Sequence, residues 1–300
     1  MRPAPIALPG AAGADARPKP PPRPTYEALR VFARNPSALA GVLLLATILA
    51  ITIFGPMLMH ADPFEIAAAP MEPPGGELLL GSDYLGRDVL TGMIYGGRAT
   101  LLVGVVAAVL SMAIGITVGA LAGYYGGWVD ETLMRITEFF QVLPTLLFAM
   151  VLVTLFSPSL ATIAVAIGVV SWTGTARLAR GEFLRLKRRE YVLAERVIGA
   201  GDARIIWRVI LPNALAPLIV SATLAIGTAI LFEAGLSFLG LGDPNVMSWG
   251  LMIGSNRPYI LTAWWAVTLP GAAIFLTVLA GSLIGDGLND ALNPTSRGRA

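Results

Sequence analysis

The sequence predicts an all-α polytopic membrane protein, from its composition and from the arrangement of its apolar residues. Hydrophobic residues make up 55% of the 300 residues and charged residues only 13%, and the mean hydropathy is +0.71. A soluble domain would be about a quarter charged. The apolar residues also come in long blocks, so a single large soluble core is excluded as the main architecture.

Each of six apolar runs is long enough to cross a bilayer as a helix. The runs hold 18 to 24 residues, and a span needs about 20. We place the spans near 39–58, 100–123, 139–156, 159–176, 214–236 and 266–285. Only Ser157-Pro158 parts the third span from the fourth, which predicts a tight turn between them.

Four glycines of the second span, Gly104, Gly115, Gly119 and Gly123, recur at intervals that are multiples of four or close to them. Small residues at this spacing let two membrane helices approach closely. The pattern therefore predicts a close helix contact along this face, although glycine is also simply common in membrane helices.

The two chain ends are expected to lie outside the membrane domain. Residues 1–24 contain eight prolines and little to bury, so we expect a disordered tail over 1–30. That segment is too long and too broken by proline for a secretory signal. The six-span domain is expected over 31–290, with a short C-terminal tail over 291–300.

The placement of Lys and Arg predicts the orientation. With the N-terminus inside, the inner segments hold 18 of the 21 basic residues and the outer segments hold three. Cytoplasmic loops carry such an excess. We therefore expect a multi-pass protein of the cell inner (plasma) membrane with both termini in the cytoplasm.

The chain lacks the residues that most catalytic and metal-binding sites need. The chain has no cysteine, and its one histidine, His60, follows the first apolar run, where a solvated interfacial residue is expected. Neither Lys19 nor Lys187 follows a phosphate-binding Gly-x-x-x-x-Gly. We expect no catalytic site, no metal site and no nucleotide hydrolysis on this chain.

The spans lack the mid-membrane charges that proton- or ion-coupled carriers usually keep. Glu233 is expected at the outer boundary of the fifth span, where it either lines an outer gate or caps a helix end near water. The driving energy for any transport is therefore expected to come from a partner.

Residues 177–213 hold nine basic residues, yet they also have internal order. Good helix formers fill 190–198, and Gly199 and Gly201 predict a reversal of the chain. Asp202 is predicted to cap a second helix, and Pro212 to mark the entry to the fifth span. A basic re-entry loop that serves only the orientation stays open as the alternative.

An apolar stripe is predicted on that second helix. Its members fall at i, i+1, i+4 and i+5, which is one helix face. They are Ile205, Ile206, Val209 and Ile210.

The same loop resembles the EAA loop of the membrane subunits of binding-protein-dependent ABC importers. The resemblance is carried by Tyr191-Val192-Leu193-Ala194-Glu195-Arg196-Val197-Ile198-Gly199-Ala200 and Ile210-Leu211-Pro212-Asn213-Ala214. The family pattern is Glu-Ala-Ala, three residues, Gly, nine residues, Ile, one residue, Leu-Pro. Gly199, Leu211 and Pro212 match it in spacing, and Val209 stands for the isoleucine. We call residues 177–213 the EAA-like loop.

The first triplet departs from the family pattern. Leu193-Ala194-Glu195 replaces Glu-Ala-Ala, so the leading glutamate is missing at 193, and Glu190 and Glu195 are the two candidates to replace it. The resemblance implies that this loop couples the chain to an ATPase. The coupling residues would be Leu193, Ala194, Glu195, Gly199, Ala200, Asp202 and Pro212.

Further motifs, in the same order along the chain, are similar to dipeptide, oligopeptide and nickel permeases. They are Leu80-Gly81-Ser82-Asp83-Tyr84-Leu85-Gly86-Arg87-Asp88, Tyr95-Gly96-Gly97-Arg98, Gly123-Tyr124-Tyr125-Gly126-Gly127, Leu236-Ser237-Phe238-Leu239-Gly240-Leu241-Gly242, Trp249-Gly250 and Gly285-Asp286-Gly287-Leu288. The resemblance covers nearly the whole chain after residue 30. It implies a type I ABC importer permease with six transmembrane helices.

The resemblance also implies partners. These are a second homologous permease subunit, two cytoplasmic ABC ATPase subunits that bind ATP and Mg, an extracytoplasmic solute-binding protein and membrane lipid, with no nucleic acid. This chain itself would hold no cofactor. Asp83, Arg87 and Asp88 would lie where the binding protein docks, unless they only form a solvated, turn-rich loop.

The expected function is import of di- or oligopeptides or a similar small solute, powered by the separate ATPase subunits. A permease for nickel chelates or another small solute is the alternative within the same class. A secondary carrier or channel, and a membrane scaffold without transport, are alternatives from other classes. The apolar spans do not indicate the cargo or the residues that line the pathway.

Overall fold

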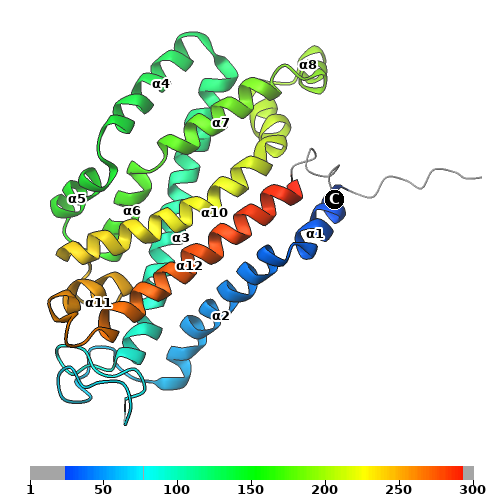
Figure 1. Cartoon of the computed structure of the whole chain (residues 1–300). Coiled ribbons are helices and arrows are strands. Elements are labelled where there is room, and N and C mark those ends of the chain that lie inside the picture. The colour runs from blue at the N-terminus through cyan, green and yellow to red at the C-terminus, as the bar shows by residue number, and fades with distance from the viewer. Residues whose placement is uncertain (1–23, 77, 293–300) are drawn as a thin grey trace, which may run out of the picture.

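The computed structural model describes residues 24–76 and 78–292, and this part of the chain is a bundle of helices with only isolated β-bridges (Figure 1). The helices, in chain order, are α1 Pro24–Arg34, α2 Pro36–Met59, α3 Val89–Tyr125, α4 Gly127–Val142, α5 Thr145–Phe156, α6 Leu160–Val170, α7 Thr173–Leu186, α8 Glu190–Val197, α9 Asp202–Arg204, η1 Ile205–Ile210, α10 Leu211–Leu236, η2 Ser237–Leu241, α11 Trp249–Asn256, η3 Arg257–Tyr259 and α12 Trp265–Leu292.

In the described part of the chain, four unbroken helical stretches are long and apolar enough to cross a membrane, and two bent helix pairs raise the number to six. The unbroken stretches are Pro36–Met59, Val89–Tyr125, Asp202–Leu241 and Trp265–Leu292. The expected first, second, fifth and sixth spans fall within them.

The third and fourth spans differ from the expected straight helices. α4 and α5 meet at 86°, and α6 and α7 meet at 43°. The first break has a local cause, because Leu143 precedes Pro144 and takes an extended backbone with ψ of 130°. The expected span 139–156 therefore crosses this break and belongs to two helices with different directions.

α3 begins well before the expected start at residue 100. Its first turn is capped by Asp88, whose carboxylate accepts hydrogen bonds from the backbone N–H groups of Leu90 and Thr91 at 3.1 and 3.0 Å. The helix runs for 37 residues, or about 55 Å at 1.5 Å per residue. Residues 89–99, expected in an outer loop, are thus helical.

The ends of the chain also show a difference. α1 begins at Pro24, so residues 24–30, expected in an irregular tail, are helical. The expected tails at 1–23 and 293–300 lie outside the described residues. Asn35 caps α2 and also donates from Nδ2 to Asp290 Oδ2 at 3.2 Å, which ties the α1–α2 corner to α12.

The glycines of α3 bring two backbones into contact, as their spacing predicts. A Cβ at Gly115 would lie 2.7 Å from the Trp172 carbonyl oxygen, and one at Gly123 would lie 2.8 Å from that of Arg180. Gly119 is equally tight against Ala176 and Ala179 of α7, and Gly104 packs against Ile230 of α10. The prediction of a close helix contact along this face is confirmed.

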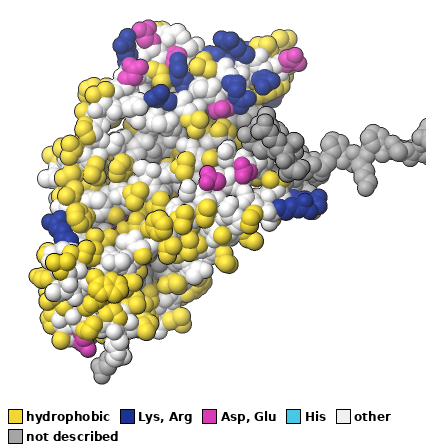
Figure 2. Space-filling view, viewed as in Figure 1, with side chains coloured by type: hydrophobic (Ala, Val, Ile, Leu, Met, Phe, Trp, Pro, Cys, Tyr) yellow, Lys and Arg dark blue, Asp and Glu magenta, His cyan; other side chains and the backbone are white. Residues whose placement is uncertain are grey.

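The molecule has two distinct ends. α2, α12 and α10 lie side by side, with α3 behind them, and α7, α8 and the top of α4 form one end (Figure 1). Charged side chains gather at this end, above a wide band that is mainly hydrophobic or uncharged (Figure 2). We call it the basic end, and we call the opposite end, with residues 60–88 and α11, the loop end.

Replacing Gly119 with alanine should separate α3 from α7. A methyl group there meets Ala179 Cβ at 2.7 Å and the backbone N of Arg180 at 2.8 Å. Overpacking of this kind costs about 1–3 kcal/mol. Gly271→Ala in α12 is the matched control, because its Cβ meets nothing within 4 Å. Denaturation in detergent should show a lower unfolding free energy for Gly119→Ala alone; equal values for the two variants would contradict the close contact.

Candidate functional site at the basic end

The EAA-like loop begins in the second half of α7 and continues as a short helix, a glycine turn and the start of a long helix. α8 spans Glu190–Val197, as the helix formers predict. Gly199 then has φ of +81°, a conformation that favours glycine. Its N–H donates to the Arg196 carbonyl and that of Ala200 donates to the Glu195 carbonyl, both at 3.0 Å. The turn therefore closes the end of α8 and reverses the chain.

The second helix of the loop continues without interruption into the fifth span. α9, η1, α10 and η2 form one stretch of 40 residues from Asp202 to Leu241, with a kink near its end at Gly240, where φ is +87°. Pro212 lies in the first turn of α10, as expected for the entry to the fifth span, although α9 and η1 run directly into that turn. The residues before Pro212 form a π-helical turn, Ile205–Ile210. In it the Leu211 N–H donates to the Ile206 carbonyl five residues back.

Asp202 does not cap this helix. Gly201 occupies the N-cap position, and no side-chain cap hydrogen bond is made there. The Asp202 carboxylate instead accepts a hydrogen bond from the Tyr124 hydroxyl at 2.5 Å. The predicted cap is therefore wrong, because the Asp202 carboxylate binds the Tyr124 hydroxyl at the end of α3 instead of a backbone N–H of its own helix.

Two basic side chains complete this contact, which we call the clasp (Tyr124, Lys187, Arg196 and Asp202). The Arg196 guanidinium carbon lies 5.2 Å from the centre of the Tyr124 ring. Lys187 Nζ donates to the Gly123 carbonyl at 2.7 Å, at the negative end of α3. Burial, together with Arg188, holds the pKa of the Lys187 ammonium below its usual value. The clasp fixes both sides of the glycine turn to α3.

Other basic residues of the EAA-like loop bind the chain itself. Arg180 forms a bidentate ion pair with Asp130 of α4, at 2.5 and 2.7 Å. Arg177 donates to Gln141 Oε1 at 3.1 Å. Charge in this loop therefore holds α7 against α4, in addition to any effect on orientation.

The predicted apolar stripe faces inward. Ile205, Ile206 and Ile210 are fully buried, and Val209 is partly buried beside them. They pack with Val192 of α8 and with buried residues of α3 and α7. The stripe prediction is confirmed, and α8 packs with the start of the long helix through one shared apolar cluster.

The tip of α8 is apolar and exposed. Val197 and Ile198 expose 86% and 74% of their surface, and Leu193 exposes 47%. Ala194 and Gly199 are also exposed, whereas Ala200 is half-buried. A cluster of large apolar side chains at the tip of a charged end is typical of a protein-binding surface.

Leu193 occupies the position at which the family pattern has its leading glutamate. Leu193 lies on the exposed side of α8. The Glu195 carboxylate lies 3.6 Å from Arg204 Nη2 across the glycine turn, and Glu190 is exposed at the start of α8. Of the two candidates, Glu195 is engaged within the loop and Glu190 is free to face a partner through its exposed side chain.

The comparisons with known proteins identify the family. The family model for the binding-protein-dependent transport system inner membrane component matches residues 115–298, and that for the N-terminal transmembrane domain of oligopeptide transport permease C matches residues 23–74. The chain belongs to this family. It is the membrane permease subunit of an ABC importer.

Curated relatives match the permease over nearly its whole length. The di/tripeptide transport system permease protein DppC of Pseudomonas aeruginosa is 42% identical over 93% of this chain and 95% of its own. The dipeptide permease DppC of Escherichia coli K12 is 44% identical over 90% and 93%, and the oligopeptide permease OppC of Bacillus subtilis is 36% identical over 90% of each chain.

A solved structure shares the fold. A chain from inward-facing conformations of the MetNI methionine ABC transporter matches with a TM-score of 0.53 and 21% identity, over 66% of this chain and 96% of its own. This agreement supports the type I permease architecture for the helices described above.

The residues proposed for binding-protein docking lie at the loop end of the permease, where they hold the loop together. Asp83 is 7% exposed, and its Oδ1 accepts from the backbone N–H groups of Leu85 and Arg87 at 2.7 and 2.9 Å. Asp88 caps α3, and the Arg87 guanidinium lies over the Phe64 ring. Their part in docking stays a prediction, and it would act through the shape of the loop rather than through free charges.

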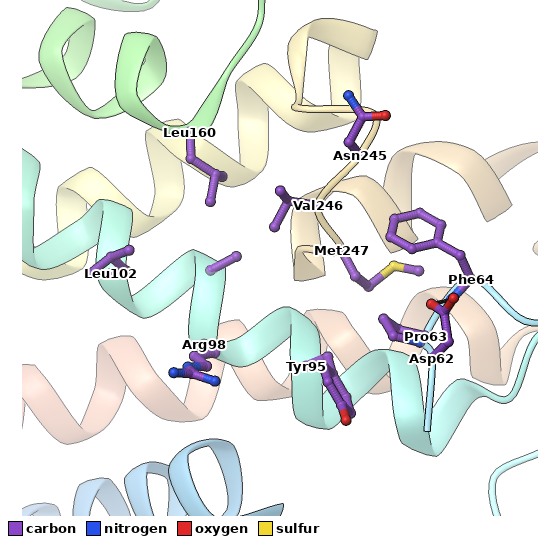
Figure 3. Close-up of a pocket in the computed structure, with 11 residues that line it drawn as sticks. Asp62, Pro63, Phe64, Tyr95, Arg98, Leu102, Leu160, Asn245, Val246 and Met247 are labelled. Carbon is purple, nitrogen blue, oxygen red and sulfur yellow. Dashed lines mark hydrogen bonds between the residues drawn. The ribbon is translucent and has the colours of Figure 1, made fainter. Parts of the chain in front are cut away.

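The loop end also has a cavity of about 410 Å³. Asp62 and Arg98 carry opposite charges in its lining, with Tyr95 between them and the apolar Leu160 and Met247 opposite (Figure 3). Within residues 24–76 and 78–292, no three His, Asp or Glu side chains gather as a metal site needs.

Glu233 is buried rather than solvated. It is 0% exposed, and Ser237 Oγ donates to its Oε1 at 2.8 Å. Helix α11 covers it, because a Cβ at Gly250 would lie 2.7 Å from Ala234 Cα. The expectation of a residue near water is thus wrong. Its role in an outer gate stays a prediction.

Sequence reasoning missed the residues that anchor the EAA-like loop. Tyr124 belongs to the Gly-Tyr-Tyr-Gly-Gly motif, but the motif does not indicate a partner 78 positions later in the chain. Asp130 was likewise not singled out. Tyr124 and Asp130 both follow the glycines of α3 in the chain. The glycine spacing was therefore the sequence signal that could have pointed to this region.

Replacing Tyr124 with phenylalanine should loosen the glycine turn. Hydrogen bonds to charged groups are worth about 1.5–3 kcal/mol, so hydrogen exchange of the amides in 198–204 should speed up at least about tenfold. Tyr125→Phe is the control, because Tyr125 is half exposed and no hydrogen bond of its hydroxyl is seen in the described part of the chain. Equal exchange in both variants would show that the clasp does not hold the turn.

Proposed function

We propose that this permease imports di- or oligopeptides across the cell inner membrane, together with a second homologous permease subunit. Two cytoplasmic ABC ATPase subunits would bind ATP and Mg and dock at the basic end. An extracytoplasmic solute-binding protein would deliver the peptide at the loop end. Both termini would lie in the cytoplasm, and this chain would catalyse no reaction itself.

The observation that carries this proposal is the exposed apolar tip of α8. This helix packs against the start of the long helix Asp202–Leu241. Leu193, Val197 and Ile198 present a hydrophobic surface, while Val192 on the other side of α8 is fully buried. The turn after α8 is fixed to α3 by the clasp and leads directly into the helix Asp202–Leu241. A push on the tip would therefore move a 40-residue helix.

The distribution of charge supports the orientation. The EAA-like loop holds nine of the 21 basic residues, and they lie at the basic end (Figure 2). An excess of Lys and Arg is typical of cytoplasmic segments. ATP is available only on that side, which suits an ATPase docked at α8.

The cargo is inferred from the relatives and from the loop end. The relatives above are named for di-, tri- and oligopeptide transport. Arg98 and Asp62 both line the cavity at the loop end, and these charges suit the carboxylate and ammonium ends of a short peptide. The chain lacks a phosphate-binding loop, so the energy would come from the ATPase partners.

Replacing Gly199 with valine should uncouple the permease. Gly199 has φ of +81°, which a β-branched residue adopts poorly. Gly201→Val is a matched control, because Gly201 has φ of −69° and ψ of 153°, which suit valine, and its Cβ also meets nothing within 4 Å. Gly199→Val should lower ATPase co-purification and uptake of labelled dipeptide by the reconstituted complex at least about tenfold.

The uptake assay also tests the cargo. Wild-type complex with its binding protein should accumulate dipeptide when ATP is supplied, and an uncoupler should not abolish that uptake. Uptake driven by a proton gradient would contradict an ATP-powered importer. Normal ATPase association and uptake in a folded Gly199→Val variant would contradict the role of this turn.

A further inference from the structure

A second cavity lies between α3, the α6–α7 break and α10, and it opens to the surface of this chain beside the exposed Gly174, Leu224 and Thr228. Its volume is about 210 Å³. Ser111 of α3, Ser171 at the break and Ser221 of α10 line it, and Gly174 and Thr175 of α7 complete its wall. Ser111 is near the middle of the apolar run 100–123 of α3, so the cavity lies within the membrane region.

The three serine hydroxyls of this cavity are not paired with the protein. Ser171 Oγ is buried without a hydrogen-bond partner, and no hydrogen bond of the Ser111 or Ser221 hydroxyl is present among residues 24–76 and 78–292. Ser111 is only 2% exposed. Leaving a buried polar group unpaired costs about 1–3 kcal/mol.

Other hydroxyls of the helices behave differently. Threonines along the bundle donate to the carbonyl three or four residues earlier at 2.7–3.0 Å, which satisfies them in an apolar setting. They are Thr47, Thr52, Thr117, Thr137, Thr154, Thr223, Thr228 and Thr277. The serines that line the cavity could do the same, but they make no such bond in the described part of the chain.

The lining carries no charge. It consists of apolar residues, among them Ile167 and Leu224, and of hydroxyl-bearing residues, with no Lys, Arg, Asp or Glu. Hydroxyls both donate and accept, so they match the N–H and C=O groups of a peptide bond and do not select a side chain or a charged terminus. The cavity is smaller than the about 300–1,000 Å³ that encloses a whole ligand, so it would hold a segment of one.

We propose that this cavity is a transit site that hydrogen-bonds the backbone of a peptide as it passes through the permease. The inference rests on the proposed peptide import and names the residues of this chain that contact the cargo. Ser111, Ser171 and Ser221 would replace the water that a peptide bond loses on entering the membrane. A site of this kind accepts peptides of different sequence, because it contacts only the groups they share.

A bulky residue at Gly174 should block the site. Gly174 lines the cavity and its Cβ would meet nothing within 4 Å, so we expect Gly174→Leu to narrow the cavity while α7 keeps its shape. Gly181→Leu is the control, because Gly181 lies in the same helix with equally open space. Dipeptide uptake by the reconstituted complex should fall about tenfold or more for Gly174→Leu relative to Gly181→Leu. Equal uptake by the two variants would overturn the proposal.

Replacing the three serines with alanine tests the hydrogen bonds. Because these hydroxyls are unpaired within the protein, the triple variant S111A/S171A/S221A should keep the thermal stability of the wild type and still lose uptake. Full uptake would overturn the transit site. A loss of uptake that comes with unfolding would also overturn it, because the hydroxyls would then be structural.

Water access can be measured directly, because the chain contains no cysteine. Ser171→Cys should react with a membrane-impermeant thiol reagent in the complex, and a dipeptide supplied with its binding protein should slow the reaction. Leu43→Cys, on the exposed apolar face of α2, should not react. An unreactive Ser171→Cys would overturn the transit site. If the wild-type complex moves no peptide at all, the proposed function fails instead.

Discussion

The structure depends on the absence of side chains at three positions of α3. Gly115, Gly119 and Gly123 let the backbone of α3 touch that of α7, and a single methyl at any of them would collide with it. Apolar burial cannot drive helices together inside lipid, so this close packing is the main attractive contact available. The contact between α3 and α7 fixes the position of α7 along the axis of α3. It thereby places Lys187 and the EAA-like loop at the end of α3.

Two features of functional interest follow from the same contact. Toward the basic end, Tyr124 comes next after the last glycine and meets Asp202. Toward the middle, Gly115 lies against Trp172 and Thr175, beside the α6–α7 break that opens the serine-lined cavity. The helix Asp202–Leu241 contacts both features, with Asp202 in the clasp and Ser221 in the cavity. Movement of this helix would therefore act on the docking loop and on the cavity together.

Much of this could be predicted from the sequence, where the signal is local. Apolar run length predicted the spans, glycine spacing predicted a close helix contact on α3 without naming α7 as the partner, and Gly199 predicted the turn. Features that depend on contacts between distant segments of the chain could not be predicted. The break at Pro144 reorients a helix without interrupting its hydropathy, the Asp202 carboxylate binds a tyrosine from another span, and Glu233 is buried in a region packed against α11. None of these partners is marked by spacing.

The central claim is that the EAA-like loop and the fifth span move as one rigid lever. Because the chain has no cysteine, pairs of spin labels can be attached through introduced cysteines at Ile198 and Leu239, and at Ile198 and Leu43. Distances should be measured by pulsed electron paramagnetic resonance in the reconstituted complex, with and without trapped ATP. The account predicts an unchanged 198–239 distance and a changed 198–43 distance. A changed 198–239 distance would contradict it.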